Sequence, residues 1–397
     1  MSSVLYTPLP HFKCTLPFAT GRTISRAMVV HPSPARPVAA AFEQEIRFCR
    51  GQDGLRLAYA IHGSGPPLVV VSCWLSHLQH DWQSPVWRHF LDQLGAIATV
   101  VRYDERGFGM SDWTVDDFSL EARVGDLEAV LAATGLERFA LLGMSGGSAV
   151  AMAYATRHPE RMSRLILYGT VCGEPVTLSP DESAEEETYR GMIRVGWARE
   201  DADFRRVFTK RFIPDATEEQ MRWFDDLQRM STSPANAVAS RIARQQVDII
   251  DDLPRIAAPT IVLQAVGDRS TTFDNAVSVS SRIPGARLVS LDSRNHILLA
   301  DEPAWRVFID EVSAFLEPER RARDERTTDR PTEELSPRER DILRLAAEGR
   351  TNDEIAITLT LSVRTVERHL SNTYAKLGLS GRVARAAAVA AYLKHQV

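Results

Sequence analysis

The segment Gly143-Met144-Ser145-Gly146-Gly147 constrains the fold of this chain more than any other stretch. It follows an apolar run over residues 139–142 and precedes a helix-like run over residues 148–156. A G-x-S-x-G sequence between a strand and a helix makes a very sharp turn with the serine at its apex. Glycines around the serine remove the Cβ atoms that would collide in such a turn. A glycine-rich turn whose serine has no catalytic role would have the same sequence. The two interpretations are separated only by finding catalytic partners for Ser145 elsewhere in the chain.

The overall composition places only broad limits on the class of protein. The 397 residues suffice for two or three domains, and 44% hydrophobic with 25% charged residues is ordinary for a soluble globular protein. A net charge of −5 excludes a chain that is basic throughout. A surface that binds nucleic acid must therefore be a local cluster of basic residues. The four cysteines show no C-x-x-C pairing and no histidine cluster at metal spacing, which predicts reduced thiols, no metal, no cofactor and a cytoplasmic location. No apolar run approaches the roughly 20 residues that span a bilayer, so we expect no membrane partner.

Residues 1–43 differ from the rest of the chain. They contain several arginines and prolines, and Glu43 is their first acidic residue. They lack a compact apolar segment, so a secretory signal is not expected. The composition superficially resembles a transit peptide, but a disordered tail, or translation that starts at Met28, is the simpler interpretation.

Strand-like and helix-like segments alternate through the first half of the chain. A hairpin is expected around Asp53-Gly54, between residues 46–49 and 55–61. Apolar or β-branched runs predict further strands at residues 68–71, 98–103, 139–143 and 165–168. Helical spacing occurs at residues 84–94, 120–133 and 148–156. This alternation predicts an α/β fold, with a mostly parallel sheet covered by helices on both faces and functional groups at the carboxyl ends of its strands.

The alternation stops over residues 174–255. Runs within this segment, at residues 185–195, 202–212 and 218–230, are helical and amphipathic. A helical insertion between two strands can fold over the strand ends as a lid. We therefore expect residues 174–255 to form a helical lid, whose tryptophans and methionines mostly build its own small core.

Two candidate partners for Ser145 follow later strands. Residues 259–265 predict a strand that leads to Asp268, and residues 286–291 predict a last strand that leads to His296. A serine hydroxyl is a weak nucleophile, so a base such as His296 must take its proton. A carboxylate such as that of Asp268 fixes the imidazole tautomer and stabilises the imidazolium. The order Ser145, Asp268, His296 predicts a catalytic triad; Glu174, which follows another strand, is a less favoured candidate for the acid.

These motifs together resemble the α/β-hydrolase fold over residues 46–316. Residues 104–112 are similar to the D-x-R-G-x-G-x-S turn of that family. The resemblance implies an oxyanion hole made of two backbone N–H groups, which by position belong to Trp74 and Gly146. Ser72-Cys73-Trp74 replaces the His-Gly sequence that family members often carry at this place. Because the donor is a backbone group, the altered side chains do not remove it.

The composition changes again after residue 316. Residues 317–333 are dense in mixed charge and then linker-like, which predicts a domain boundary. Residues 334–397 then show repeated helix-start signals. Ser336-Pro337-Arg338-Glu339 and Thr351-Asn352-Asp353-Glu354 are capping boxes, and a third helix is expected from Ser362 to Leu377. A fourth helix is expected after Arg382. Two short helices joined by a tight turn predict a helix-turn-helix that binds double-stranded DNA.

Local charge agrees with DNA binding. From Leu361 onward six basic residues accompany one acid, Glu367. Residues 334–397 resemble the LuxR-type helix-turn-helix family, on the strength of residues 335–340, 349–356 and 362–370. The resemblance implies that Glu367, Arg368 and Ser371 face bases, while Thr365, His369 and Lys376 hold phosphates; Arg364 belongs to the same basic set. It also implies a homodimer on DNA. A glutamate at position 367 departs from the frequent basic residue and could accept from cytosine N4.

The sequence thus supports two functions of different classes. The first is a DNA-binding transcriptional regulator whose hydrolase-fold domain senses a small molecule. The second is a serine hydrolase that acts on an ester or lactone, with DNA binding secondary. Fold alone does not decide between them.

Overall fold

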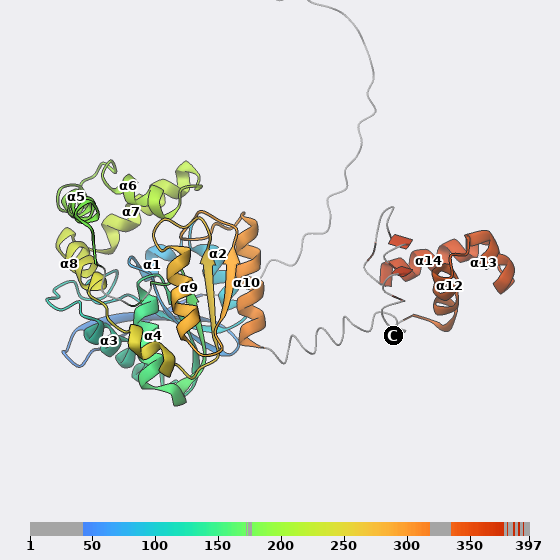
Figure 1. Ribbon diagram of the computed structural model, residues 1–397, viewed down its shortest axis with the longest axis horizontal. Coiled ribbons are helices and arrows are strands. Elements are labelled where there is room, and N and C mark those ends of the chain that lie inside the picture. The colour runs from blue at the N-terminus through green and yellow to red at the C-terminus, as the bar shows by residue number, and fades with distance from the viewer. Residues whose placement is uncertain are drawn as a thin grey trace, which may run out of the picture. The chain divides into compact units, whose positions relative to one another are not determined.

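The computed structural model describes residues 43–171, 173, 177–317, 335–376, 379, 384, 385, 388, 389 and 392. Predictions made for residues 1–42, for Glu174, for residues 318–333 and for Arg382 lie outside the described residues. Two folded parts of the chain are described, and we treat each by itself (Figure 1).

A single sheet organises the first part. Within the described residues it contains eight strands in the order β1-β2-β4-β3-β5-β6-β7-β8. Neighbouring strands from β4 to β8 in that order are parallel, and β2 pairs antiparallel with both β1 and β4. The strands are β1 Glu45–Arg50, β2 Arg56–Gly63, β3 Pro67–Val71, β4 Thr99–Tyr103, β5 Phe139–Met144, β6 Met162–Tyr168, β7 Thr260–Ala265 and β8 Arg287–Leu291. The predicted hairpin and the mostly parallel sheet are confirmed.

Helices cover both faces of this sheet (Figure 1). One apolar core joins α2 (Arg88–Gly95) and α10 (Pro303–Leu316) to the sheet, through residues such as Phe90 and Phe308. The other core joins α3 (Leu120–Thr134), α4 (Gly147–Arg157) and α9 (Phe273–Arg282). The central strands are buried on both faces, which explains their continuous apolar sequences.

The helix expected over residues 84–94 starts later than predicted. The structure has a short α1 at Leu78–Asp81, and α2 begins only at Arg88. The hydroxyl of Ser84 accepts hydrogen bonds from the backbone N–H groups of Val86 and Trp87. With the N–H of Arg88, which donates to the carbonyl of Ser84 at 3.0 Å, these bonds make a serine-capped turn over residues 84–88. The regular α-helix begins only at the end of this turn.

A helical lid follows β6, as the sequence predicts. It contains α5 (Pro180–Gly196), α6 (Arg205–Phe212), α7 (Glu218–Ser231) and α8 (Pro234–Gln245), which group together at one end of the sheet (Figure 1). Trp197, Phe208 and Phe224 are buried between these helices and join the core on that side of the sheet. Met230, which we expected among the core residues of the lid, is instead exposed.

The second part is a small helical unit. Its helices are α12 (Pro337–Ala347), α13 (Asn352–Leu359) and α14 (Val363–Lys376). Ser336 and Thr351 cap the first two helices in full capping boxes, as predicted. Ile342, Ile355, Val366 and Leu370 form the shared core. The described residues of the expected fourth helix, such as Ala388, are helical and pack on Leu335 and Leu343.

Two glycine substitutions test the packing of α4 against the sheet. A Cβ on Gly147 would lie 2.3 Å from the carbonyl oxygen of Ser72 and 2.5 Å from that of Val71. Gly147→Ala should therefore lower the free energy of unfolding by at least ~2 kcal/mol, because backbone must move. Gly125→Ala is the matched control: it lies in α3 with no atom within 4 Å of the new Cβ, so stability should rise by ~0.5–1 kcal/mol.

Urea unfolding of the full chain, followed by tryptophan fluorescence, measures both variants. All seven tryptophans lie between residues 74 and 305, so the signal reports the sheet-containing part alone. Equal stability of Gly147→Ala and the wild-type chain would contradict the close approach of α4 to β3.

Candidate active site and candidate DNA-binding helix

Ser145 occupies the sharp turn between β5 and α4. Its backbone has φ 51°, in the left-handed region that few residues other than glycine adopt. The N–H of Ser145 donates to the carbonyl of Tyr168 at 2.8 Å, and its carbonyl accepts from the N–H of Ser148 at 2.9 Å. These bonds hold the strained residue between the end of β6 and the first turn of α4. A strained backbone held in this way is typical of functional sites.

The glycines around Ser145 are required by close packing. A Cβ on Gly143 would lie 2.7 Å from the Cβ of Ala151 and from the Cα of Ser148. Together with Gly147, this glycine lets the first turn of α4 lie directly against β3 and β5. The serine is therefore presented at the carboxyl edge of the sheet, where such folds place their functional groups.

Asp268 and His296 lie together at the same edge. Nδ1 of His296 is 2.6 Å from Oδ2 of Asp268, and both side chains are buried. The carboxylate also accepts from the hydroxyl of Thr271 at 2.8 Å and from the N–H of Ser270 at 2.7 Å. Burial alone would raise the pKa of Asp268, but the charge and hydrogen bond of His296, with these two donors, bring the pKa below its ordinary value. Asp268 is therefore suited to remain ionised beside an imidazolium.

The end of β6 brings His296 near Ser145. Tyr168, which accepts from the N–H of Ser145, donates its hydroxyl to the carbonyl of His296 at 2.8 Å. The next residue, Gly169, has φ 58°, and a Cβ there would lie 3.0 Å from Cε1 of His296. The imidazole thus packs against the strand end that also holds the serine backbone. In the described part of the chain, neither the Ser145 hydroxyl nor Nε2 of His296 forms a hydrogen bond. Ser145 lines a cavity at this edge of the sheet, whereas His296 is buried beside it.

The two residues whose N–H groups the sequence assigns to an oxyanion hole line the same cavity. Trp74 and Gly146 both line it with Ser145. The N–H groups of Trp74 and Gly146 donate to no other described residue, which leaves them available to a developing oxyanion. The indole of Trp74 is fixed separately, because its Nε1 donates to the hydroxyl of Ser240 at 3.0 Å.

The turn over residues 104–112 braces the loop that carries Trp74. The buried carboxylate of Asp104 accepts from the hydroxyl of Ser76 at 2.8 Å, and from the N–H groups of Leu78 at 3.1 Å and Met110 at 2.8 Å. Gly109 must be glycine, because a Cβ there would lie 2.2 Å from Oδ2 of Asp104. The turn motif therefore acts on the site indirectly, by positioning the segment after β3.

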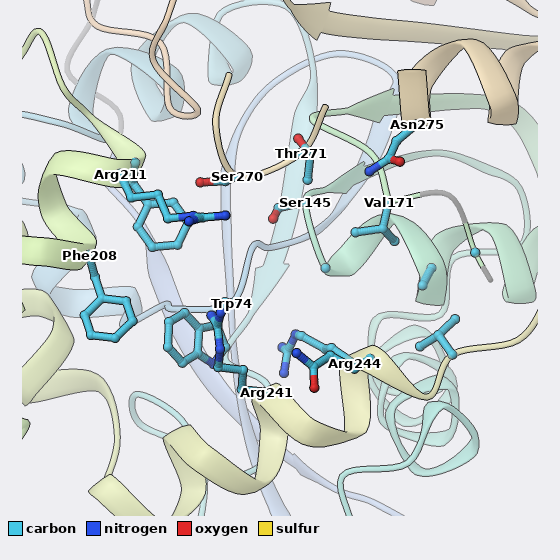
Figure 2. Close-up of a pocket in the computed structure, with 16 residues that line it drawn as sticks. Trp74, Ser145, Val171, Phe208, Arg211, Arg241, Arg244, Ser270, Thr271 and Asn275 are labelled. Carbon is cyan, nitrogen blue, oxygen red and sulfur yellow. The ribbon is translucent and has the colours of Figure 1, made fainter. Parts of the chain in front are cut away.

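We did not predict the arginines that line this cavity. The cavity has a volume of about 240 Å³, and Arg211 of α6 with Arg241 and Arg244 of α8 contribute to its wall. Figure 2 shows these three side chains entering the space around Ser145 and Trp74 from the lid side. Arg241 and Arg244 are three residues apart on a helix and so share a face, a spacing that was visible in the sequence.

The predicted DNA-contacting residues form an exposed surface on α14. Arg364, Glu367, Arg368 and Ser371 are exposed and fall at i, i+3, i+4 and i+7, on one face of the helix. The opposite face, with Val366, Leu370 and Thr373, is buried.

The three residues expected to hold phosphates are more constrained by neighbouring groups than the residues of the exposed face. Thr365 and His369 are half-buried, and the Thr365 hydroxyl lies 2.7 Å from that of Ser362. Nζ of Lys376 lies 2.7 Å from a carboxylate oxygen of Glu339, so a phosphate would compete with this carboxylate for the lysine. The turn between α13 and α14 passes through Thr360, which ends α13 in the left-handed conformation with φ 54°. Glycine is the residue more often found at such a helix end.

Among the described residues, no group of three or more His, Cys, Asp or Glu side chains is arranged to hold a metal ion. Of the helices that these described residues form, none combines the length and the apolar character needed to cross a membrane.

Known proteins resemble this chain in both of its folded parts. Residues 333–389 match the family of bacterial regulatory proteins called the luxR family, and residues 66–216 match the alpha/beta hydrolase fold family. A 2-hydroxy-6-oxononadienedioate/2-hydroxy-6-oxononatrienedioate hydrolase of Paraburkholderia phymatum is 30% identical over 260 residues, which cover 62% of this chain and 86% of that protein. The AB hydrolase superfamily protein YisY of Bacillus subtilis is 26% identical over 238 residues, which cover 59% and 86%.

A solved structure gives the same result. The crystal structure of a hydrolase from Pseudomonas aeruginosa matches with a TM-score of 0.57 and 26% identity, over 68% of this chain and 98% of that one. The chain therefore belongs to the α/β-hydrolase fold family, and it carries after that domain a helix-turn-helix domain of the luxR family of bacterial regulatory proteins.

Proposed function

We propose that this protein is a transcriptional regulator whose hydrolase-fold domain binds and hydrolyses a small-molecule signal, while its C-terminal domain binds DNA. The main support is that one chain joins a cavity containing Ser145 to an exposed helix, α14, of the luxR-family domain. The boundaries we propose are residues 44–316 for the hydrolase domain, with the lid at 174–255, and residues 334–397 for the DNA-binding domain. Residues 317–333 would connect the two. Binding to chromosomal DNA also fits the cytoplasmic location that the sequence predicts.

The proposed reaction is hydrolysis of an ester or lactone through an acyl-enzyme. His296 takes the proton of Ser145 as its hydroxyl oxygen attacks the acyl carbon, and Asp268 stabilises the imidazolium that forms. The N–H groups of Trp74 and Gly146 donate to the oxyanion of the tetrahedral intermediate. The protonated His296 then gives its proton to the leaving alcohol. Water attacks the acyl-serine in the same way, and the carboxylic acid leaves with Ser145 restored.

Several features of the site support these roles. The Asp268–His296 contact of 2.6 Å is short and buried, as an orienting carboxylate requires. The left-handed backbone of Ser145 places this residue at the apex of a sharp turn, and Ser145 lines the cavity.

DNA recognition is proposed for the exposed face of α14. Arg368, with Glu367 and Ser371, would contact base edges in the major groove, and Thr365, His369 and Lys376 would contact phosphates, with Arg364 adding positive charge. Helix-turn-helix proteins commonly bind two half-sites as dimers, so we propose a homodimer on a palindromic site.

A serine hydrolase with only secondary DNA binding is the second candidate. The buried Asp268–His296 pair favours it, because a receptor that only binds a ligand has no need of an oriented imidazole. The two functions are compatible, since hydrolysis could reset the signal. Turnover by the wild-type chain distinguishes an active hydrolase from a receptor that has kept the fold alone.

Replacement of the nucleophile tests the proposed reaction. Ser145→Ala should lower kcat/KM for short 4-nitrophenyl esters by about 10⁴-fold or more, because the acyl-enzyme cannot form. Ser281→Ala, an exposed serine on α9, is the matched control and should keep wild-type turnover. Release of nitrophenolate measures the rates. Turnover that survives in Ser145→Ala, or that is absent in the wild-type chain, would rule out the proposed hydrolysis.

A second substitution tests the proposed DNA contact. Arg368→Ala should weaken binding to a DNA site, selected from random sequences by the full chain, by ~1–3 kcal/mol, as expected for one lost base contact. Arg344→Ala removes an exposed arginine from α12 and should change the affinity little. Fluorescence anisotropy at fixed salt concentration gives both values. An affinity for Arg368→Ala equal to that of the wild-type chain would contradict the role of α14.

A further inference from the structure

The cavity beside Ser145 is lined by positive charge without a balancing acid. Its charged lining residues are Arg211, Arg241 and Arg244, and no Asp or Glu contributes to its wall within the described residues. The rest of the wall is largely apolar or neutral, with side chains such as Trp74 and Phe212. A neutral ester would require no such charge at this place. The arginines therefore need an explanation that the hydrolytic mechanism does not supply.

The carboxylates behind the cavity do not neutralise these arginines. The carboxylate of Glu105 has one oxygen 2.6 Å from Nη2 of Arg244 and the other 3.8 Å from Nε of Arg123. One carboxylate therefore pairs with two guanidinium groups. Arg123 is 1% exposed, and none of its three guanidinium nitrogens has a hydrogen-bond partner among the described residues. Burial, together with the nearby charge of Arg244, lowers the pKa of Arg123 to about 10. Around Arg244, where Arg123 and Arg244 share the carboxylate of Glu105, positive charge therefore exceeds negative charge.

A second carboxylate, that of Glu186, is also shared between two arginines. Both oxygens of Glu186 bind Arg241, at 2.6 and 2.7 Å, and one of them also lies 3.3 Å from Arg190. Arg211 has the weakest compensation of the three lining arginines. Its closest carboxylate, on the exposed Glu185, is 3.7 Å away.

Aromatic side chains hold two of the arginines in place. Tyr189 lies between them: its ring centroid is 5.5 Å from the guanidinium carbon of Arg211 and 5.4 Å from that of Arg241. The Tyr189 hydroxyl accepts from Arg211 at 3.1 Å, and Arg241 also lies over the ring of Trp74 at 5.7 Å. Guanidinium groups fixed in this way lose little entropy when they bind a ligand.

The third arginine lies against the serine turn. A Cβ on Gly146 would be 2.6 Å from Nε of Arg244, so this side chain rests on the glycine that follows Ser145. Its Nε is buried and has no hydrogen-bond partner among the described residues. An oxyanion that reached this nitrogen would accept a hydrogen bond that no described residue accepts.

We propose that Arg211 and Arg241, with Arg244 beside the serine turn, form an anion subsite, so that the ligand of this cavity carries a carboxylate or phosphate in addition to its scissile acyl group. This inference rests on the proposed hydrolase function for its account of the acyl group. The class of substrate is then a half-ester, an acidic lactone or a similar acyl compound with a second, charged oxygen group. The lid supplies the anion subsite, and the ends of the strands supply the reacting groups.

Paired substrates test this subsite in the full chain. Mono-4-nitrophenyl glutarate carries a free carboxylate, and 4-nitrophenyl valerate is an uncharged ester of the same acyl length. The wild-type chain should favour the charged ester by about tenfold or more in kcat/KM, the scale of one charge-assisted hydrogen bond. Arg211→Gln should remove most of this preference, because it should lower kcat/KM for the glutarate far more than for the valerate. Arg211→Lys should retain part of it.

Lys210→Gln is the matched control, because it removes the same charge from an exposed position next to Arg211 on α6. It should keep the preference for the charged ester. An equal preference for the two esters in the wild-type chain would overturn the proposal. An equal fall for both esters in Arg211→Gln would do the same, since it would mark a structural role for this arginine.

Binding without turnover separates this inference from the proposed reaction. Thermal unfolding of the wild-type chain should shift upward with monomethyl glutarate or butyl phosphate, and not with dimethyl glutarate; the larger shift identifies the preferred anion. Arg211→Gln should reduce the shift. A chain that turns over no ester but shows these shifts has the anion subsite and lacks the proposed hydrolysis. No shift with either anion would contradict the subsite, whatever the outcome for the esters.

Discussion

The close contact between the first turn of α4 and the ends of β3 and β5 determines the rest of the candidate site. Gly143 and Gly147 permit this contact, because a Cβ at either position would lie within 2.7 Å of a neighbouring atom. Ser145 adopts a left-handed backbone in this turn, and Gly146 lies in the wall of the cavity. Parallel strands then bring Asp268 and His296 to the same edge, although they are far from the serine in sequence. A small set of backbone positions thus arranges the whole candidate reaction centre.

The lid adds a chemical property that the sheet does not have. The strand ends provide a nucleophile, a base and N–H donors, which suit any ester. Arginines from α6 and α8 surround these groups with positive charge that is only partly compensated by Glu105 and Glu186. In our account the lid therefore selects the ligand and the sheet edge performs the reaction. This division of roles also fits a sensor, because a lid can change the ligand that it selects without disturbing the strands beneath it.

Much of this architecture could be predicted from the sequence, for identifiable physical reasons. Buried strands such as β3 and β5 are continuous apolar runs, and the capping boxes at Ser336 and Thr351 mark helix starts through local hydrogen bonds. The start of α2 was placed too early because residues 84–87 form a serine-capped turn before the regular helix begins. The cavity arginines were missed because their environment depends on distant partners: Arg244 and Glu105 are 139 residues apart. The base-facing positions Glu367, Arg368 and Ser371 were assigned through the resemblance to the LuxR-type family, and all three are exposed on α14.

The central claim is that the cavity around Ser145 and the DNA-binding face of α14 act as one regulator. Two sites in one protein are coupled only if a ligand at one changes the affinity of the other. The most direct measurement is the Kd of full-length Ser145→Ala for its selected DNA site, with and without monomethyl glutarate at a concentration that saturates the thermal shift. The account predicts a change of about fivefold or more, in the range of known allosteric couplings. An unchanged Kd at saturating ligand would show that the two domains work independently, and would contradict the account.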